Sequence, residues 1–413
     1  MSKRLGKLEQ YFQNLVTLDE NDPNLDFGTR LLLFCLKRLS HLYLAIIQLR
    51  LFLYAKGVFR HHTLGCQVIS IGNLTVGGTG KTPVVEIFAR ELQKEGRRVA
   101  ILSRGYKKEN PPLYRRIIAT LNGRKTHNYP RVVSDGKSLL LNSAMSGDEP
   151  YMLASNLPDV CVLVDKNRVR SGRYAISRLG CDTLILDDGF QYLALRHRVE
   201  IVLVDRTNPF GNGYLLPRGL LREPVTNIKR ANYIFITKCE PTGAPEIKAK
   251  LKKMNPNAEI IECCHSPRYL KNVYSSEKLE LAWLQNRKIV ALSGIAAPAG
   301  FENELSARGA KIVEKIRFED HHRYTQQEII EIINKSKTLG AEAIITTEKD
   351  AVRFPLLERC DVPIYFLRVD IEIITGAEDF KSCIKRICFK DMEKKTEPST
   401  TSPEKKQCNI IIQ

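Results

Sequence analysis

The chain has 413 residues, of which 43% are hydrophobic and 27% charged, and these proportions of a globular protein exclude a wholly disordered chain. The formal net charge of +18 favours an anionic partner, and nucleic acid, acidic lipid and polyphosphate all qualify. The 11 cysteines are scattered and contain no Cys-x-x-Cys pair, which argues against a disulfide framework or a zinc knuckle and predicts reduced thiols in a cytoplasmic compartment. The length predicts two or three domains.

The N-terminal segment, residues 1–60, joins a polar start to an apolar and basic stretch. Residues 1–28 lack the pattern of a secretory signal. From Arg30 to Phe59 the chain is rich in Leu, Ile, Phe and Tyr, with basic residues between them. The longest uncharged run, Leu39 to Leu49, has 11 residues, whereas a spanning helix needs roughly 20, so no spanning helix is predicted. An amphipathic helix in the membrane interface and a core-packing helix fit the pattern equally well.

The stretch from Val68 to Pro83 has the order strand, glycine-rich loop, helix. A β-branched run ends at Gly72, and Lys81 and Thr82 lead into a helix with apolar periodicity. Backbone N–H groups of such a loop point at phosphate oxygens, the lysine adds a positive charge, and the threonine hydroxyl is a ligand for Mg²⁺. We expect a phosphate loop in preference to an ordinary glycine turn, although Thr75 stands where the usual loop has glycine. The phosphate-binding residues would be Thr75, Val76, Gly77, Gly78, Thr79, Gly80, Lys81 and Thr82.

Apolar runs after the loop predict a mostly parallel α/β sheet. A strand beginning near Arg97 is followed by a polar, turn-rich stretch to about Asn142. Three further runs each end in a carboxylate, and such carboxylates lie along the crevice where open α/β sheets bind ligands. The runs are Val160–Val164 before Asp165, Thr183–Leu186 before Asp187 and Asp188, and Ile201–Val204 before Asp205. With strands at Tyr233–Ile236 and Glu259–Cys263, residues 61–268 are predicted to form a P-loop NTPase-like domain.

The rest of the chain predicts a second, smaller α/β domain. Residues 269–285 lack clear periodicity and are interpreted as a connector to this domain, at residues 286–360. Its expected strands are Ile289–Leu292, Lys311–Lys315 and Ala343–Thr346, and its expected helices are Phe301–Arg308 and Gln326–Leu339. Residues 361–391 add a strand, Pro363–Val369, and a terminal helix, Asp379–Phe389, and residues 392–413 are predicted to be a disordered tail.

Acidic pairs supply the candidate chemistry. A phosphate loop needs a carboxylate across the sheet to hold the metal, and Asp187 and Asp188 follow a strand as in a Walker B segment. Paired aspartates also occur in plain turns. Asp148 and Glu149 stand at a glycine-preceded helix start. Asp148 is a candidate base and Glu149 a partner of the helix dipole, and ordinary helix-start chemistry is the alternative.

Histidine and arginine segments give further candidates. The Asp-His-His sequence at 320–322 pairs imidazole with carboxylate, a pattern more often found in a capped surface turn than in a catalytic pair. Arg168 follows a predicted strand and Arg222 lies in a Pro- and Gly-containing segment at 216–224. Bidentate arginine stabilises the charge of a moving phosphoryl group, and solvated arginine is the alternative for each.

The motifs stand in one order along the chain: Gly72–Pro83, Ser103–Tyr106, Gly147–Pro150, Leu186–Gln191, Phe210–Gly213, Leu216–Pro217, Leu221–Pro224, Ser293–Ile295, Phe301, Asp320–His322 and Thr346–Asp350. In this order the sequence resembles the tetraacyldisaccharide 4'-kinase family, the lipid A 4'-kinases of Gram-negative bacteria, over roughly residues 30–370. Thr75 at the loop start belongs to the family pattern.

The resemblance implies transfer of the γ-phosphoryl group of ATP, with Mg²⁺, to the 4'-hydroxyl of a tetraacylated glucosamine disaccharide 1-phosphate. The product would be the bis-phosphorylated lipid A precursor. By the same resemblance Lys81 would hold the β- and γ-phosphates, and Thr82 with Asp187 or Asp188 the magnesium.

The resemblance also implies roles for residues of both predicted domains. Asp148 would accept the proton of the 4'-hydroxyl, with His321 orienting or tuning it. Glu149, Arg168 and Arg222 would line the site. Because the base and His321 belong to different predicted domains, catalysis is expected to require domain closure over ATP.

The acyl-chain substrate implied by the resemblance favours a membrane-interface helix at Arg30–Phe59. The expected location is the cytoplasmic face of the inner membrane, as a peripheral protein, and the expected partners are the lipid substrate and the membrane surface. No nucleic-acid partner is expected, because the basic residues are dispersed along the chain and no motif of aromatic and basic residues that recognises nucleic acid is present. No obligate protein partner is evident.

The sequence departs from the family pattern at two places, and two other functions remain as alternatives. Tyr192 stands where the family usually has histidine, and Lys107-Lys108 where glycine is usual. One rival is a GTPase or metallochaperone with a related loop, since the segment 237–240 distantly echoes the guanine-reading Asn-Lys-x-Asp. The other is a membrane-associated scaffold that binds nucleotide without turnover.

Overall fold

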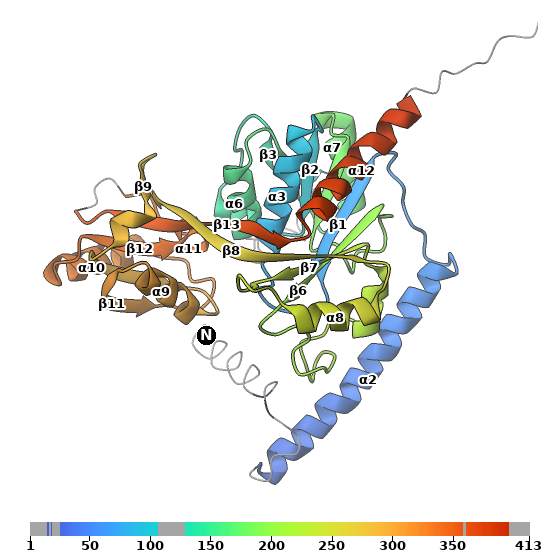
Figure 1. The fold of residues 1–413 in the computed structure, drawn as a ribbon, viewed down its shortest axis with the longest axis horizontal. Helices are drawn as coiled ribbons and strands as arrows, with labels where there is room; N and C mark the ends of the chain where they lie inside the picture. The colour runs from blue at the N-terminus through green and yellow to red at the C-terminus, as the bar shows by residue number, and fades with distance from the viewer. Residues whose placement is uncertain (1–14, 16–17, 19–24, 106–128, 358–360, 396–413) are drawn as a thin grey trace, which may run out of the picture.

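The computed structural model describes Leu15, Leu18 and residues 25–105, 129–357 and 361–395 (Figure 1). Its strands are β1 (Gln67–Asn73), β2 (Val99–Ser103), β3 (Arg131–Asp135), β4 (Cys161–Val164), β5 (Thr183–Asp187), β6 (Val199–Asp205), β7 (Tyr233–Thr237), β8 (Glu259–Asn272), β9 (Lys278–Glu280), β10 (Lys288–Ser293), β11 (Lys311–Arg317), β12 (Ala343–Thr347) and β13 (Ile364–Thr375). The prediction for Lys107-Lys108 lies outside the described residues, and so does most of the tail predicted at 392–413. Residues 392–395 of that tail are described and belong to the terminal helix, Ala377–Lys395, so this helix runs further than predicted.

The helices alternate with these strands. They are α2 (Phe27–Ala55), α3 (Lys81–Lys94), α5 (Ser143–Ser146), α6 (Asp148–Asn156), α7 (Arg168–Leu179), α8 (Pro245–Met254), α9 (Pro298–Ala307), α10 (Gln326–Thr338), α11 (Glu348–Ala351) and α12 (Ala377–Lys395), with 3₁₀ turns η1 (Val225–Arg230) and η2 (Leu281–Leu284). The predicted alternation of strand and helix is confirmed in both parts of the chain.

One sheet passes through the described part of the chain, in the order β11-β10-β12-β13-β8-β7-β6-β1-β5-β2-β4-β3, with β9 beside β8. Neighbours from β8 through β7, β6, β1, β5 and β2 to β4 pair in parallel, and β3 adds an antiparallel edge. Strands β11, β10, β12 and β13 also pair in parallel. The predicted α/β class with a mostly parallel sheet is confirmed.

Figure 1 shows two lobes at the ends of this sheet. The first lobe contains β1–β7 with α3, α6, α7, α8 and α12, and the second contains β10–β12 with α9, α10 and α11. In the first lobe Phe88 of α3 lies edge-on to Phe235 of β7 at 5.6 Å and to Phe380 of α12 at 5.0 Å between ring centroids. The terminal helix α12 therefore packs against α3 of the first lobe. Neighbouring strand residues alternate between the two covered faces, Ile69 in this core and Val68 in the core beneath α7.

Strands β8 and β13 join the lobes as a long antiparallel pair, from Tyr365 opposite Asn272 to Thr375 opposite Glu262. The sequence predicted both strands too short, and it predicted no strand at β3. The reason is physical: the distal part of β8 and the edge strand β3 are only partly buried, so they lack a continuous apolar run. The segment interpreted as a connector contains the end of β8, then β9 and η2. The domain boundaries themselves stay a prediction.

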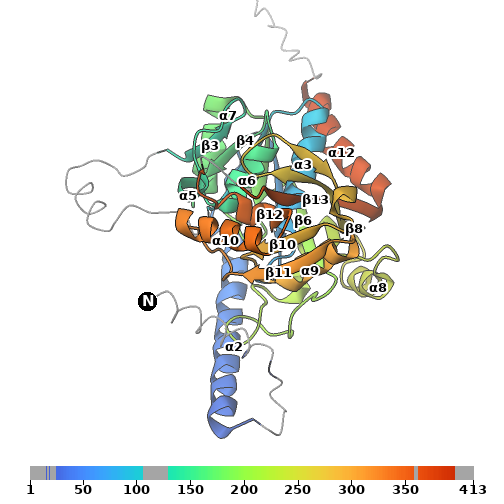
Figure 2. The same cartoon turned by 90° about the vertical axis from the view of Figure 1, so that its left-hand side faces the viewer.

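Helix α2 lies on the outside of the first lobe, and its N-terminal part extends beyond the strands and the other labelled helices in Figure 2. It begins earlier than predicted because Asp26 caps it, accepting a hydrogen bond from the Thr29 N–H at 2.9 Å. Its length of 29 residues and a window of mean hydropathy 1.4 are sufficient, by length and composition, to cross a membrane. The prediction that this segment does not span a membrane therefore stays a prediction, and the contacts of α2 bear on it below.

Candidate active site

The phosphate loop joins β1 to α3 and leaves the start of α3 open. Gly80, the residue before the helix, has a φ of 76° and gives no side-chain cap to the first helical turn. Asn73 Nδ2 donates to Thr79 Oγ1 at 3.0 Å, and Thr237 Oγ1 donates to the Thr79 carbonyl at 2.9 Å, which fixes the loop just before Gly80. An uncapped helix N-terminus with Lys81 at its first position suits phosphate oxygens.

The other loop residues differ in what they offer to a ligand. Thr75 and Thr82 are buried, whereas residues 76–78 are exposed at the mouth of the loop. The Val76 N–H already donates to the Leu220 carbonyl at 2.8 Å. The loop is thus held from one side by the segment that carries Arg222.

Lys81 lies between two acceptors. Its Nζ is 3.3 Å from Asn73 Oδ1 and 3.5 Å from Asp188 Oδ1. Arg222 Nη1 donates to both oxygens of Asp188, at 2.9 and 2.7 Å. Burial alone would raise the pKa of Asp188, but the charges of Lys81 and Arg222 outweigh it and lower this pKa. Asp188 also holds a left-handed φ of 56°, a conformation that non-glycine residues rarely adopt away from constrained sites.

Asp187 is buried beside two other carboxylates. Ser103 Oγ donates to Asp187 Oδ2 at 3.0 Å. Burial, together with the negative charges of Glu149 and Asp188, raises the pKa of Asp187 to about 6. A divalent cation would relieve this repulsion between carboxylates, so the residues present fit Mg²⁺.

No group of three or more His, Cys, Asp or Glu side chains within the described ranges is placed to hold a metal by itself. Mg²⁺ is usually held by one or two carboxylates together with substrate phosphates and water.

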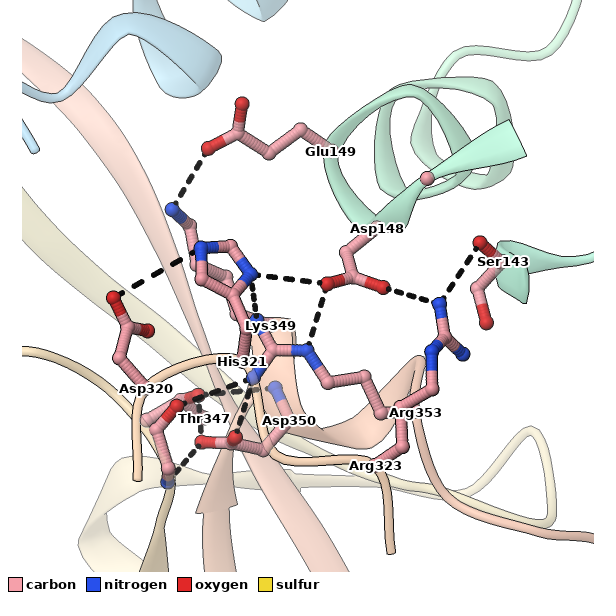
Figure 3. Close-up of polar contacts among 12 residues, drawn as sticks. Ser143, Asp148, Glu149, Asp320, His321, Arg323, Thr347, Lys349, Asp350 and Arg353 are labelled. Carbon is pink, nitrogen blue, oxygen red and sulfur yellow. Dashed lines mark hydrogen bonds and ion pairs between the residues drawn. The ribbon is translucent and has the colours of Figure 1, made fainter. Parts of the chain in front are cut away.

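Asp148 lies at the meeting point of the two lobes (Figure 3). It starts α6 in the first lobe and accepts from Arg353 Nε at 2.9 Å and from Arg323 Nη2 at 3.2 Å, both from the second-lobe side of the site. His321 Nδ1 lies 3.3 Å from Asp148 Oδ2. Burial alone would raise the pKa of Asp148, but the hydrogen bond with His321 and the charges of Arg353 and Arg323 outweigh it and lower this pKa.

His321 Nδ1 has two competing neighbours. Arg353 Nη2, which can only donate, lies 3.2 Å from it, and Asp148 Oδ2, which accepts, lies 3.3 Å away. One ring nitrogen cannot accept and donate at once. When Nδ1 carries a proton it donates a hydrogen bond to Asp148, and when Nδ1 is unprotonated it accepts a hydrogen bond from Arg353. His321 also holds a left-handed φ of 66°, which non-glycine residues rarely adopt away from constrained sites.

Glu149 connects the Asp148 centre to the phosphate loop. Its Oε1 accepts from Lys349 Nζ at 3.0 Å. Burial alone would raise the pKa of Glu149, but Lys349 outweighs it, with further contributions from Lys81 and His321, so the pKa is lowered. The two groups of candidate residues therefore share one electrostatic environment.

Arg168 is placed behind Asp187 rather than at the open mouth of the site. It is 5% exposed, and its Nη2 donates to the Asp187 carbonyl at 2.9 Å. Tyr192, the departure noted above, accepts from the Arg168 N–H at 2.9 Å and lies 5.1 Å from its guanidinium. Burial lowers the pKa of Arg168. Tyr192 thus contacts a candidate site residue, which the sequence had not indicated.

The sequence missed three residues of this site: Arg323, Lys349 and Arg353. Arg353 follows Asp350 by three residues, and Lys349 belongs to the motif Thr346–Asp350, so the motif itself was the available signal. No local pattern places the arginines beside Asp148, because 175 and 205 residues separate them from it.

Comparison with known proteins gives one answer over most of the chain. The family described as tetraacyldisaccharide-1-P 4'-kinase, LpxK, matches residues 32–388. A tetraacyldisaccharide 4'-kinase of Anaeromyxobacter sp. (strain K) is 39% identical over 345 residues, which are 82% of this chain and 86% of the relative. A tetraacyldisaccharide 4'-kinase of Halothermothrix orenii is 37% identical over 360 residues, with 84% and 88% covered.

A solved structure agrees with these relatives. The crystal structure of LpxK from Aquifex aeolicus in complex with ATP superposes with a TM-score of 0.67 at 29% identity, over 86% of this chain and 99% of that chain. The resemblance inferred from the motifs is therefore confirmed, and this chain belongs to the tetraacyldisaccharide 4'-kinase family.

Proposed function

We propose that this protein transfers the γ-phosphoryl group of ATP to the 4'-hydroxyl of a tetraacylated glucosamine disaccharide 1-phosphate, in lipid A biosynthesis. The observation that carries the proposal is the position of Asp148, which faces His321 at 3.3 Å and directly precedes Glu149, a neighbour of Lys81. A candidate base and a phosphate loop thus converge. Family membership supports the lipid substrate, and ATP in the Aquifex aeolicus structure supports the nucleotide.

The phosphate loop would bind the ATP phosphates. The open first turn of α3 offers N–H donors, and Lys81 would leave its contacts with Asn73 and Asp188 to reach the β- and γ-phosphates. Arg222 would keep Asp188 in place when Lys81 moves, because it holds both oxygens of that carboxylate.

Thr82, Asp187 and Asp188 would hold Mg²⁺, which when bound neutralises charge on the phosphate oxygens. Ser103 orients Asp187 through its hydrogen bond, and Arg168 fixes the backbone at the same residue. These two contacts would hold the Asp187 carboxylate in a fixed orientation for the cation.

Asp148 would accept the proton of the 4'-hydroxyl. Its Oδ1 has one donor, Arg323, whereas Oδ2 faces Arg353 and His321, so Oδ1 has more capacity to accept a proton. Because the pKa of Asp148 is lowered, the carboxylate is ionised at neutral pH and acts through its position rather than through strong basicity.

We infer that α2 lies in the membrane interface at the cytoplasmic face, without spanning. Ser40 Oγ donates to the Leu215 carbonyl at 2.8 Å, Tyr43 to the Arg222 carbonyl at 3.0 Å and Arg50 to the Gln191 carbonyl at 2.9 Å. Because these hydrogen bonds hold the central and C-terminal parts of α2 against the first lobe, α2 could not cross a bilayer without losing them. Its exposed apolar side chains would instead face lipid; among them are Leu39, Leu42, Ile46, Leu49 and Phe52.

Incubation of the detergent-solubilised protein with ATP, Mg²⁺ and the tetraacyldisaccharide 1-phosphate tests the proposal. Mass spectrometry is expected to show a lipid product with one more phosphate, and Asp148→Asn is expected to lose it. Replacing ATP by GTP tests the GTPase alternative. ATP binding without lipid product would contradict the proposal and favour the scaffold.

A further inference from the structure

A closed ring of charged and polar side chains connects the two lobes. Arg368 Nη1 donates to both oxygens of Glu348 at 3.0 Å, and its Nη2 donates to Glu86. Arg90 donates to Glu86 at 2.6 Å and to the Asn156 carbonyl at 2.9 Å. Asn156 Nδ2 closes the ring by donating to Glu348 at 2.6 Å. We call these residues the inter-lobe ring.

The inter-lobe ring joins four elements that each lead to the site. Glu86 and Arg90 lie on α3, the helix of the phosphate loop, and Asn156 ends α6, the helix that Asp148 begins. Arg368 lies on β13, one of the strands between the lobes. Glu348 begins α11 in the second lobe.

The position of Glu348 is the informative one, because the residues after it reach the candidate base. Lys349 donates to Glu149, and Arg353 donates to Asp148 at 2.9 Å and to the Gly294 carbonyl at 3.1 Å. Holding Glu348 against α6 therefore sets where these side chains meet the first lobe.

The centre of the inter-lobe ring, Arg368 with Glu86 and Glu348, is buried, whereas the side chain of Arg90 is 44% exposed. The side chains of Arg368 and Glu86 are each 6% exposed and that of Glu348 is 14% exposed. Loss of one partner from a buried ion pair leaves an uncompensated charge, so such a network tolerates few alternative arrangements. Its geometry consequently favours the relative placement of the lobes that this structure shows, with Glu348 held against α6.

We propose that Arg368 and Glu348 are positioning residues for the phosphoryl transfer, and that the inter-lobe ring sets the distance between Asp148 and the His321–Arg353 side of the site. The inference rests on the proposed roles of Asp148 and His321. By this inference, contacts through β13 and α11 keep the phosphate loop at the start of α3 and the candidate base at the start of α6 at a fixed distance from each other.

Steady-state kinetics of Glu348→Gln test this inference. The variant keeps the size of the side chain and removes its charge. We expect kcat to fall by about 10- to 100-fold, the effect of a misplacement of about 1 Å, with KM for ATP unchanged. Arg368→Lys keeps the positive charge but loses the guanidinium group that donates two hydrogen bonds to one carboxylate. This variant is expected to retain more activity than Arg368→Met, which removes the charge as well. Glu314→Gln is the matched control, because it removes an exposed ion pair, with Lys335 at 3.0 Å, from the same lobe.

A double-mutant cycle with His321→Ala separates positioning from general damage. If the inter-lobe ring acts through the contact with His321, Glu348→Gln costs little further activity once His321 is absent. An equal loss of kcat in both backgrounds would overturn the inference, as would parent-like activity of Glu348→Gln. Should Glu348→Gln not fold, judged by ATP binding, the same cycle is run with Arg368→Lys. Parent-like activity of His321→Ala alone would instead show that the proposed role of His321 is wrong, and with it this inference.

Discussion

Asp148 illustrates how individual residues set the chemistry of this site. Its carboxylate is surrounded by Arg323, Arg353 and His321, so its ionised form is strongly favoured. The competition between Arg353 and Asp148 for one nitrogen of His321 gives the histidine two hydrogen-bonding states. If Asp148 accepts the proton as proposed, its attraction for Arg353 and Arg323 would weaken, because a neutral carboxyl no longer pairs with a positive charge.

Arg323→Gln is expected to move the acid limb of the kcat–pH profile to higher pH. Arg323 lowers the pKa of Asp148, so its removal raises that pKa, and the carboxylate becomes protonated at a higher pH. At neutral pH kcat is expected to fall by about tenfold or less, because one charge-assisted hydrogen bond is lost at a partly exposed position. Arg308→Gln, which breaks the pair with Glu304 at 2.8 Å on α9, is the control. An unshifted acid limb would contradict the assignment.

At the scale of elements, the sequence predicted those helices and strands whose apolar residues are buried and follow a regular pattern along the chain. The apolar runs that became β4, β5, β6 and β7 were found because both faces of these strands are covered. The distal parts of β8 and β13 were missed, because a strand pair between lobes needs backbone pairing but no continuous apolar run. The candidate site residues divide in the same way. Asp148 was named from its position at a helix start and His321 through the family resemblance, whereas no local pattern of the sequence indicates Arg353, which reaches Asp148 only in the folded chain.

Helix α2 is linked to the phosphate site through the Arg222 segment. Tyr43 donates to the Arg222 carbonyl at 3.0 Å, and the Arg222 N–H donates to the Leu74 carbonyl at 2.7 Å at the start of the phosphate loop. The side chain of Arg222 in turn holds Asp188. The helix expected at the membrane therefore contacts the nucleotide site through one intermediate segment.

Tyr43→Phe is expected to lower kcat/KM for ATP by about fivefold, since one hydrogen bond of about 1 kcal/mol that positions Arg222 is removed. Tyr54→Phe on the same helix is the control, because the described side-chain contacts of Tyr54 are made by its ring, with Phe59, His61 and Arg50, and phenylalanine keeps the ring. Initial rates across ATP concentrations provide the measurement. Equal values for the two variants would show that α2 does not support the site in this way.

At the scale of the whole molecule, the net charge and the exposed apolar side chains of α2 both support the proposed placement at an anionic membrane surface. A net charge of +18 would attract anionic lipid at a distance. Helix α2 adds exposed apolar side chains, including Leu42 at 59% and Ile46 at 54% exposure. Long-range attraction and short-range insertion together would hold the site at the surface where the acylated substrate lies.

We therefore expect the full chain to float with vesicles that contain anionic lipid, and to bind less as salt rises, because ions screen the attraction. The double variant Leu42→Gln/Ile46→Gln is expected to bind at least about tenfold more weakly, since burying either side chain contributes on the order of 1.5 kcal/mol. Ile330→Gln, at an exposed position on α10, is the control.

Alkaline carbonate treatment of these membranes distinguishes the two placements of α2. A helix in the interface is held by surface contacts and charge, so the protein is expected to be released. A spanning helix keeps its apolar residues in the hydrocarbon core and would stay with the membrane. Retention would contradict the peripheral placement, and it would also require Ser40, Tyr43 and Arg50 to leave their contacts with the first lobe. Because those contacts lead to Arg222 and Gln191, a spanning arrangement should also lower kinase activity, which gives the same question a second, independent measurement.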